Sequence, residues 1–245
     1  MRTILPLGFI VDIVLQFWQR VPAPIVHNLS KAKMLKLVFW HLNVDQRMGF
    51  YMEFGVAHGH SMRSAVLANN FAHSKKLGIL PINRSFYGID TFEGFKSNNP
   101  LDQHPVWKLD AFTKPLAKIE RRFRNNKSSI KFLKFDATML TETTEPEVLL
   151  FKRSIQESAA LLLFDMDLYE PTIKALDWIQ PFITGGTFIM FDEFFAFNGE
   201  LDKGEAKAFY EFSKKNQNLT FREFATYGSG GKVFIVSNKS HAVIE

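Results

Sequence analysis

The feature that most constrains the fold is a repeat of short apolar runs, each ending at or next to an acidic residue, that alternate with segments of helical spacing. The runs are residues 50–54, 85–89, 130–135, 160–165 and 186–192, and their acids are Glu53, Asp90, Asp136, Asp165 and Asp192. This alternation is typical of βα units around a mostly parallel sheet. Because the carboxyl ends of parallel strands share one edge, where ligands bind, we expect the five acids to lie along that edge.

Helices are predicted between these strands, and a hairpin is predicted after them. Pro146 and Pro171 each stand where a first helical turn would begin, a position that tolerates a missing amide donor. Residues 219–227 and 232–237 flank the short turn Gly-Ser-Gly-Gly, which can join two strands only as an antiparallel hairpin. The predicted helices are residues 61–73, 111–126, 146–158, 171–182 and 203–215. We therefore predict an α/β fold, Rossmann-like, with a seven-stranded mostly parallel sheet, a terminal antiparallel hairpin and helices on both faces.

Composition limits the number of domains and the chemistry. The chain has 245 residues, of which 46% are hydrophobic, enough for one α/β domain with a full core. We place this domain at residues 46–245, after an amino-terminal helical extension at residues 1–45. The chain has no cysteine, which excludes disulfides, thiolate nucleophiles and sulfur-rich zinc sites.

The net charge of +5 comes from scattered basic residues, with a local cluster at residues 121–127. A solvated helix face is the simpler interpretation of this cluster, and a nucleic-acid patch is the alternative. We expect no nucleic-acid partner.

The amino-terminal segment 4–18 is apolar but shorter than the ~20 residues that span a bilayer, and it contains Asp12. No small-residue cleavage site follows it, so we predict an amphipathic helix, then a break at Val-Pro-Ala-Pro, then a second helix at residues 28–42. Its apolar residues recur every three to four positions, at Leu5, Phe9, Ile13, Phe17 and Trp18. Such a face must be covered, and the domain core or a second copy in a homodimer is favoured over a membrane surface. We expect a cytoplasmic protein.

The stretch Glu53-Phe-Gly-Val-Ala-His-Gly-His-Ser61 joins the first strand to its helix. Gly55 and Gly59 allow the backbone to approach a ligand closely, and Gly59 can adopt a positive φ without steric cost. The dinucleotide fingerprint G-x-G-x-x-G is not matched, because the spacing is G-x-x-x-G and an acid precedes it. A carboxylate beside the loop favours a cationic ligand such as an ammonium or a sulfonium over a phosphate.

The next two strand ends carry groups suited to a nucleoside. Asp90, in Tyr-Gly-Ile-Asp-Thr-Phe-Glu-Gly-Phe (87–95), ends the strand next to the glycine unit, where a carboxylate can accept both hydroxyls of a ribose. A turn cap is the alternative role. Asp136, followed by Ala137, stands where an adenine amine would lie, and a loop cap is again the alternative.

A group of acids follows the fourth and fifth strands. Asp165, Asp167, Asp192 and Glu193 end adjacent strands, and unpaired carboxylates at this density repel one another. A hard divalent ion such as Mg²⁺, bound by oxygen ligands, would account for them. Asp167 and Glu170 could instead cap the helix that begins near Pro171.

Histidines offer candidate bases. His58 and His60, beside a site that favours a cationic ligand, are expected to be neutral loop residues, because a charged imidazole would repel such a ligand. His104, in the long loop 96–108, could reach the sheet edge and act as a general base.

These motifs resemble those of class I S-adenosylmethionine-dependent methyltransferases, and among them the macrocin O-methyltransferase group. The similar segments are EFGVAHGHS, YGIDTFEGF, DMDLYEPT and FDEF, and the resemblance covers about residues 50–236. It departs from the group's pattern at Glu193, where the group has a second aspartate, and at the two histidines of the glycine loop.

The resemblance implies a role for each motif. Cofactor contacts are implied for Glu53, Gly55, Gly59 and Ser61 (methionine part), for Asp90 with Thr91 (ribose), and for Asp136 with Ala137 (adenine). Mg²⁺ ligands are implied at Asp165, Asp192 and Glu193, where the ion would lower the pKa of a substrate hydroxyl. We name Asp165 and His104 as candidate catalytic residues.

The expected function is transfer of a methyl group from S-adenosylmethionine to a hydroxyl of a small, sugar-containing or polyhydroxylated molecule. Two alternatives remain open. One is a binding or assembly module of the same fold without catalysis, and the other is a nicotinamide-dependent oxidoreductase, which the glycine spacing disfavours.

Overall fold

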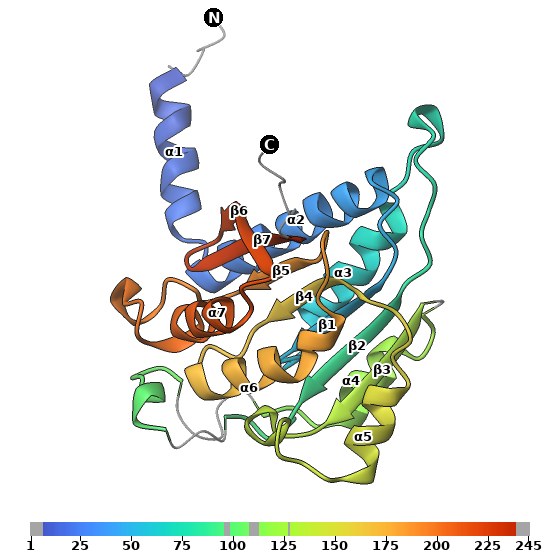
Figure 1. Ribbon diagram of the computed structural model, residues 1–245. Helices are drawn as coiled ribbons and strands as arrows, with labels where there is room; N and C mark the ends of the chain where they lie inside the picture. Colours follow the sequence, from blue (N-terminus) through green and yellow to red (C-terminus); the bar gives the residue numbers. More distant parts are fainter. Residues whose placement is uncertain (1–6, 96–98, 108–112, 127, 239–245) are drawn as a thin grey trace, which may run out of the picture.

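The computed structural model describes residues 7–95, 99–107, 113–126 and 128–238. Its strands are β1 (Phe50–Phe54), β2 (Ser85–Asp90), β3 (Ser129–Lys134), β4 (Ala159–Phe164), β5 (Phe188–Phe191), β6 (Leu219–Tyr227) and β7 (Gly231–Asn238). They form one sheet in the order β3-β2-β1-β4-β5-β7-β6, in which β7 alone runs in the opposite direction to the other strands (Figure 1). The predicted seven-stranded sheet with a terminal hairpin is confirmed.

The helices cover both faces of this sheet. They are α1 (Leu7–Gln19), α2 (Ala23–Val44), α3 (His60–Phe71), α4 (Leu116–Phe123), α5 (Pro146–Arg153), α6 (Tyr169–Ile179) and α7 (Gly204–Lys215). Buried side chains of α2, α3 and α4 form one core cluster with the sheet, and those of α5, α6 and α7 form another. Successive side chains of β1 point to opposite faces of the sheet, so this strand contributes to both clusters. Tyr51 belongs to the first cluster, and Phe50, Met52 and Phe54 belong to the second.

Strand burial follows position in the sheet. The central strands β1, β4 and β5 are buried along their whole length, as expected for parallel strands that helices cover on both faces. The edge strand β3 buries only Leu133, and it exposes Lys131 and Lys134, whose charges discourage pairing with another chain.

The second helix begins earlier than predicted. The break expected at Val-Pro-Ala-Pro is confined to residues 20–22, and α2 begins at Ala23 rather than at residue 28. Pro24 lies in its first turn, where the missing N–H is not needed for a helical hydrogen bond. The earlier start places His27 inside the helix. Residues 111–112, where the helix predicted at residues 111–126 was expected to begin, lie outside the described residues.

The helix α1 stands apart from the sheet and its covering helices (Figure 1). Leu5, one residue of its predicted apolar face, lies outside the described residues. Val14, Phe17 and Trp18 are exposed. Within the described residues, no helix is both long and apolar enough to span a membrane.

Candidate functional site

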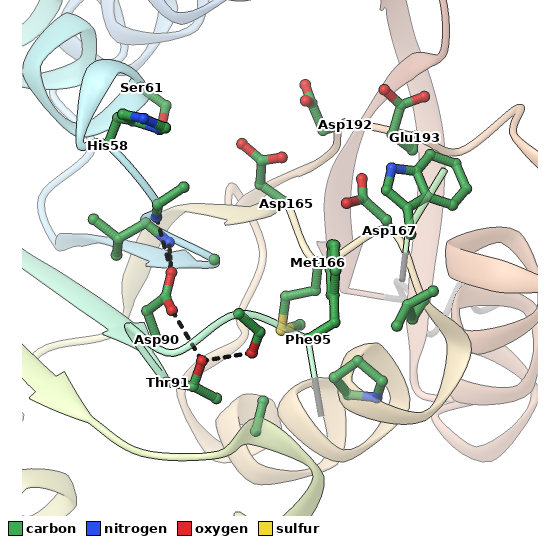
Figure 2. Close-up of a pocket in the computed structure, with 18 of the residues that line it drawn as sticks. His58, Ser61, Asp90, Thr91, Phe95, Asp165, Met166, Asp167, Asp192 and Glu193 are labelled. Atoms are coloured by element: carbon green, nitrogen blue, oxygen red, sulfur yellow. Dashed lines mark hydrogen bonds between the residues drawn. The ribbon is translucent and has the colours of Figure 1, made fainter. Parts of the chain in front are cut away.

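A cavity of about 480 Å³ opens at the carboxyl ends of the parallel strands. It lies where the chain order reverses, with β1, β2 and β3 on one side and β4 and β5 on the other. Asp90 and Thr91 line one end of it, and Asp165, Asp167, Asp192 and Glu193 gather at the other (Figure 2). Of the five acids predicted to lie along this edge, Asp90, Asp136, Asp165 and Asp192 line the cavity, and Glu53 does not.

The glycine loop after β1 has the expected conformation. Gly59 has φ of 68° and stands at the amino terminus of α3, as predicted. Gly55 has φ of 87°, and a Cβ there would lie 2.0 Å from the carbonyl oxygen of Asp165. Only glycine allows the loops after β1 and β4 to come this close. Gly55 and Ser61 line the cavity, whereas Gly59 is not among the lining residues.

Asp90 binds the glycine loop. Its Oδ2 accepts hydrogen bonds from the backbone N–H groups of Val56 (2.7 Å) and Ala57 (2.8 Å), and its Oδ1 accepts one from Phe92 (2.6 Å). The carboxylate thus caps turns, as the alternative proposed, and also lines the cavity together with Thr91.

Asp136 is also both a cap and a lining residue of the cavity. Its Oδ1 accepts hydrogen bonds from the backbone N–H (2.9 Å) and the hydroxyl (2.8 Å) of Thr138, so it is a loop cap. Asp136, Ala137 and Thr138 all line the cavity beside Asp90.

Glu53 lies behind the cavity wall. Its side chain is fully buried, accepts hydrogen bonds from the hydroxyls of Tyr51 (2.8 Å) and Ser61, and is not among the lining residues. Burial raises the pKa of Glu53 to about 8, against the opposing effect of the Ser61 hydrogen bond. Glu53 therefore orients Ser61, which faces the cavity.

The acids at the other end differ in their pKa values. Burial, and then the charge of Asp192, raise the pKa of Asp165 to about 7. Burial also favours a higher pKa for Asp192, but Lys31 and His27 outweigh it and hold that pKa below its ordinary value. Burial raises the pKa of Glu193 and, to a greater extent, that of Asp167. Asp192 is thus the acid that keeps its charge most firmly.

Two residues of α2, neither of them predicted from the sequence as a site residue, complete this end. Lys31 Nζ lies 2.7 Å from Asp165 Oδ2 and 2.7 Å from Asp192 Oδ2. His27 Nε2 lies 3.0 Å from Asp192 Oδ1, and this hydrogen bond, which outweighs burial, raises the pKa of His27. Their spacing of four residues, which puts both on one face of a helix, was the available signal.

The described side chains do not fit the expected magnesium ion. The ammonium of Lys31 lies between Asp165 and Asp192, where an ion shared by these two carboxylates would lie. Ligand atoms of His27, Asp192 and Glu193 fall within 4.8 Å of one another, but those of His27 and Asp192 are already hydrogen bonded to each other. The prediction of Mg²⁺ is not supported.

The structure does not bring His104 to the acids. Its ring stacks on Trp107 with centroids 3.7 Å apart, and Trp107, not His104, lines the cavity. His58 and His60 do line it, and burial together with neighbouring basic residues lowers the pKa of each. This agrees with the prediction that both are neutral.

The cap of α6 comes from an unexpected residue. Asp102, in the loop after β2, accepts hydrogen bonds from the backbone N–H groups of Tyr169 (2.6 Å) and Glu170 (3.2 Å). Neither Asp167 nor Glu170 provides the cap, so that alternative for the two acids is wrong. Asp167 is left to line the cavity, with φ of 64°.

Several solved structures with a similar fold are O-methyltransferases. CalS11, a calicheamicin methyltransferase, has a TM-score of 0.61 and 21% identity over 96% of this chain and 87% of that chain. The O-methyltransferase NovP has a TM-score of 0.60 and 18% identity over 84% and 79% of the two chains. An O-methyltransferase from Bacillus cereus in complex with SAH has a TM-score of 0.51 and 14% identity over 96% and 94%.

These likenesses show that the chain has the fold of S-adenosylmethionine-dependent O-methyltransferases, as the motifs suggested. No protein-family model matches the chain, and no match was found among curated proteins.

Proposed function

We propose that this protein is an O-methyltransferase that transfers a methyl group from S-adenosylmethionine to a hydroxyl of a small, sugar-containing or polyhydroxylated molecule. One observation carries the proposal. One cavity has the glycine loop with Asp90 and Asp136, acids suited to a nucleoside, at one end and a group of carboxylates at the other. Such a cavity can hold a cofactor and an acceptor side by side.

The lining residues fit this cofactor. Asp90 with Thr91 would hold the ribose, Asp136 with Ala137 would lie at the adenine, and Gly55 and Ser61 would surround the methionine part. Glu53 and Gly59 would not touch the cofactor. Glu53 would orient Ser61, and Gly59 would turn the chain into α3. When bound, S-adenosylmethionine supplies a methyl group on a positively charged sulfur, which becomes a neutral thioether as the acceptor oxygen takes the methyl group.

Asp165 is the residue we propose as general base. Its side chain is 22% exposed and lines the cavity, whereas that of Asp192 is 6% exposed. A carboxylate whose pKa is about 7 can take a proton from a hydroxyl and still be ionised in much of the protein near neutral pH. Asp165 would accept the proton that the acceptor hydroxyl loses. His104 is the weaker candidate, because it lies behind Trp107.

The acceptor class rests on the same acids. Carboxylates accept hydrogen bonds, so several of them in one cavity suit a molecule with several hydroxyls. One structure of CalS11, with a TM-score of 0.53, is described as a TDP-rhamnose 3'-O-methyltransferase of calicheamicin biosynthesis, which supports a sugar-containing acceptor.

We also propose a homodimer in which α1 contacts a second copy. Exposed apolar residues on α1 support a contact surface. A protein surface is favoured over lipid because α1 carries no basic residue in its last turn, whereas interfacial helices are rich in Lys and Arg.

The test is calorimetry with S-adenosylhomocysteine, followed by turnover assays on a panel of sugar-containing hydroxyl acceptors. Asp90→Ala should lose roughly 1 to 3 kcal/mol of binding, because ribose hydroxyls would be left unpaired. Asp165→Asn should bind S-adenosylhomocysteine normally and lose roughly 10²- to 10⁴-fold in turnover, the usual contribution of a general base. A folded protein that binds NAD but not S-adenosylhomocysteine would contradict the proposal.

A further inference from the structure

Lys31 is buried against the acids of the cavity. Its side chain is 6% exposed, and its ammonium makes two short ion pairs, to Asp165 and Asp192, both 2.7 Å long. Burial lowers the pKa of Lys31, but the charges of Asp165 and Asp192 outweigh it and raise that pKa above its ordinary value. The ammonium is therefore a permanent positive charge between the two carboxylates.

The position of Lys31 is fixed by the core. Leu35, one turn further along α2, is fully buried, and so are Val38 and Phe39. All three belong to the core cluster that α2 shares with α3 and α4. Because α2 is held along this face, it delivers the Lys31 side chain to the ends of β4 and β5.

The partners of Asp192 leave little room for a metal ion. Its Oδ1 accepts a hydrogen bond from Tyr227 Oη (2.9 Å) and is also hydrogen bonded to His27 Nε2 (3.0 Å). Its Oδ2 accepts a hydrogen bond from Lys31 Nζ. The backbone N–H of Ser229 donates to His27 Nδ1 (3.1 Å), so a neutral His27 carries its proton on Nε2 and has no lone pair there for a metal.

Displacing Lys31 would be costly. A divalent ion at Asp165 and Asp192 would have to expel the ammonium or lie beside it, and an ammonium that loses its partners while buried is strongly destabilising. Two carboxylates that already share one cation also attract a second cation less strongly.

We infer that Lys31 is a built-in cation that replaces the divalent metal ion at Asp165 and Asp192, so that the protein binds no metal there. This inference rests on the proposed function only for its catalytic consequence, which is that methyl transfer needs no metal. Lys31 lines the cavity, and an ammonium has three N–H donors, of which Asp165 and Asp192 take two. The third can donate to the oxygen of the acceptor hydroxyl, so Lys31 would position the oxygen from which Asp165 takes the proton.

The experiment titrates the whole protein, without cofactor, with Mn²⁺ and follows free Mn²⁺ by electron paramagnetic resonance. Wild type should bind no Mn²⁺ at micromolar concentration. Lys31→Ala should gain one site, because the Oδ2 atoms of Asp165 and Asp192 lose the cation that they share. Lys36→Ala, on the exposed side of the same helix, is the matched control and should gain none.

A double variant, Lys31→Ala with Asp192→Asn, should lose the gained site. The inference is overturned if wild type binds one Mn²⁺ that Asp192→Asn abolishes, or if folded Lys31→Ala gains no site. If Lys31→Ala does not fold, the comparison of wild type with Asp192→Asn still decides the matter.

Activity provides an independent readout. Turnover of wild type should be unchanged by EDTA and by added Mg²⁺, and loss of turnover in EDTA, restored by Mg²⁺, would overturn the inference. Because Mn²⁺ binding is measured without cofactor or acceptor, a protein that fails to bind S-adenosylhomocysteine would contradict the proposed function while leaving the Mn²⁺ result to stand.

Discussion

A single buried acid, Glu53, shows how a residue can serve a site without entering it. Its carboxyl group lies beneath the glycine loop, in contact with the Tyr51 and Ser61 hydroxyls and out of reach of the cavity. The resemblance to the methyltransferases implied that Glu53 contacts the cofactor. The alternation of side chains along β1, which directs Glu53 to the same face as Tyr51 and into the core, decides its actual position.

Glu53 should make stability depend on pH. Its pKa is about 8 in the folded protein against an ordinary value of 4.5. Below pH 4.5 the group is protonated in both states and has no effect on stability. Between pH 4.5 and 8 the folded state keeps a proton that the unfolded chain releases, so the free energy of unfolding should fall as pH rises, and above pH 8 the cost is fully present.

Glu53→Gln should therefore reduce the slope of unfolding free energy against pH over this window, as measured by denaturant titration at a series of pH values. Glu120→Gln, at an exposed site on α4, is the control and should keep the wild-type slope. Equal slopes in wild type and Glu53→Gln would show that burial does not hold the proton on Glu53.

At the scale of elements, the turn between β6 and β7 must pack closely on α2. Gly228 has φ of 58°, and a Cβ there would lie 2.3 Å from His27 Nδ1. This turn holds His27 through Ser229, and His27 in turn contacts Asp192. The hairpin therefore supports the acid end of the cavity as well as the sheet edge.

Gly228→Ala should destabilise the protein by more than backbone strain alone. Gly78 is a matched control, because its φ is 71° and an added Cβ would meet nothing within 4 Å. Gly78→Ala should cost about 1 to 2 kcal/mol for the left-handed conformation. Gly228→Ala should cost roughly 1 to 3 kcal/mol more for the clash with His27, measured by thermal unfolding. Equal losses in the two variants would mean that the turn and α2 separate easily.

Local patterns were enough to predict most elements. Each central strand is an apolar run that ends at or next to an acid, and the predicted β1 matches Phe50–Phe54. Strand β5 is shorter than predicted, because Gly186 turns the chain with φ of 85° before Phe188. The insertion of β7 between β5 and β6 is a long-range choice that no local pattern encodes.

The candidate site was predictable only where strands supply it. The position of the acids at the strand ends can be predicted from the parallel sheet without knowing which residues they pair with. Lys31 pairs with residues 134 and 161 positions away, and helical spacing tells which face of α2 it shares with His27 but not what that face meets. A cluster of carboxylates without a visible partner therefore predicted a metal ion, while the cation was in a helix assigned to the amino-terminal extension.

At the scale of the whole molecule, α1 is the element that the domain leaves uncovered. Phe17 is 71% exposed, and Val14 and Trp18 are also exposed beside it on a helix that stands away from the sheet (Figure 1). We expect this exposed apolar surface to contact the second copy of the proposed homodimer.

Sedimentation should therefore show a dimer at micromolar concentration and no binding to liposomes. Phe17→Glu should shift the protein to monomer, because a charge would be buried in the contact. The control is Phe71→Glu, a comparably exposed aromatic at the end of α3, which should remain a dimer. A wild-type protein that sediments as a monomer would exclude the homodimer.

The hydrogen bond between His27 and Ser229 joins residues 202 positions apart, and this separation bears on how the protein is made. The ribosome synthesises α2 early, with Lys31 and His27, and it synthesises β4 and β5, with Asp165 and Asp192 at their ends, much later. The turn that fixes His27 emerges after all of them. A nascent chain halted before Ser229 would thus carry Lys31 and both aspartates without the hairpin that holds His27 beside them, so we expect the acid end of the cavity to be completed late in translation, after the glycine loop has formed.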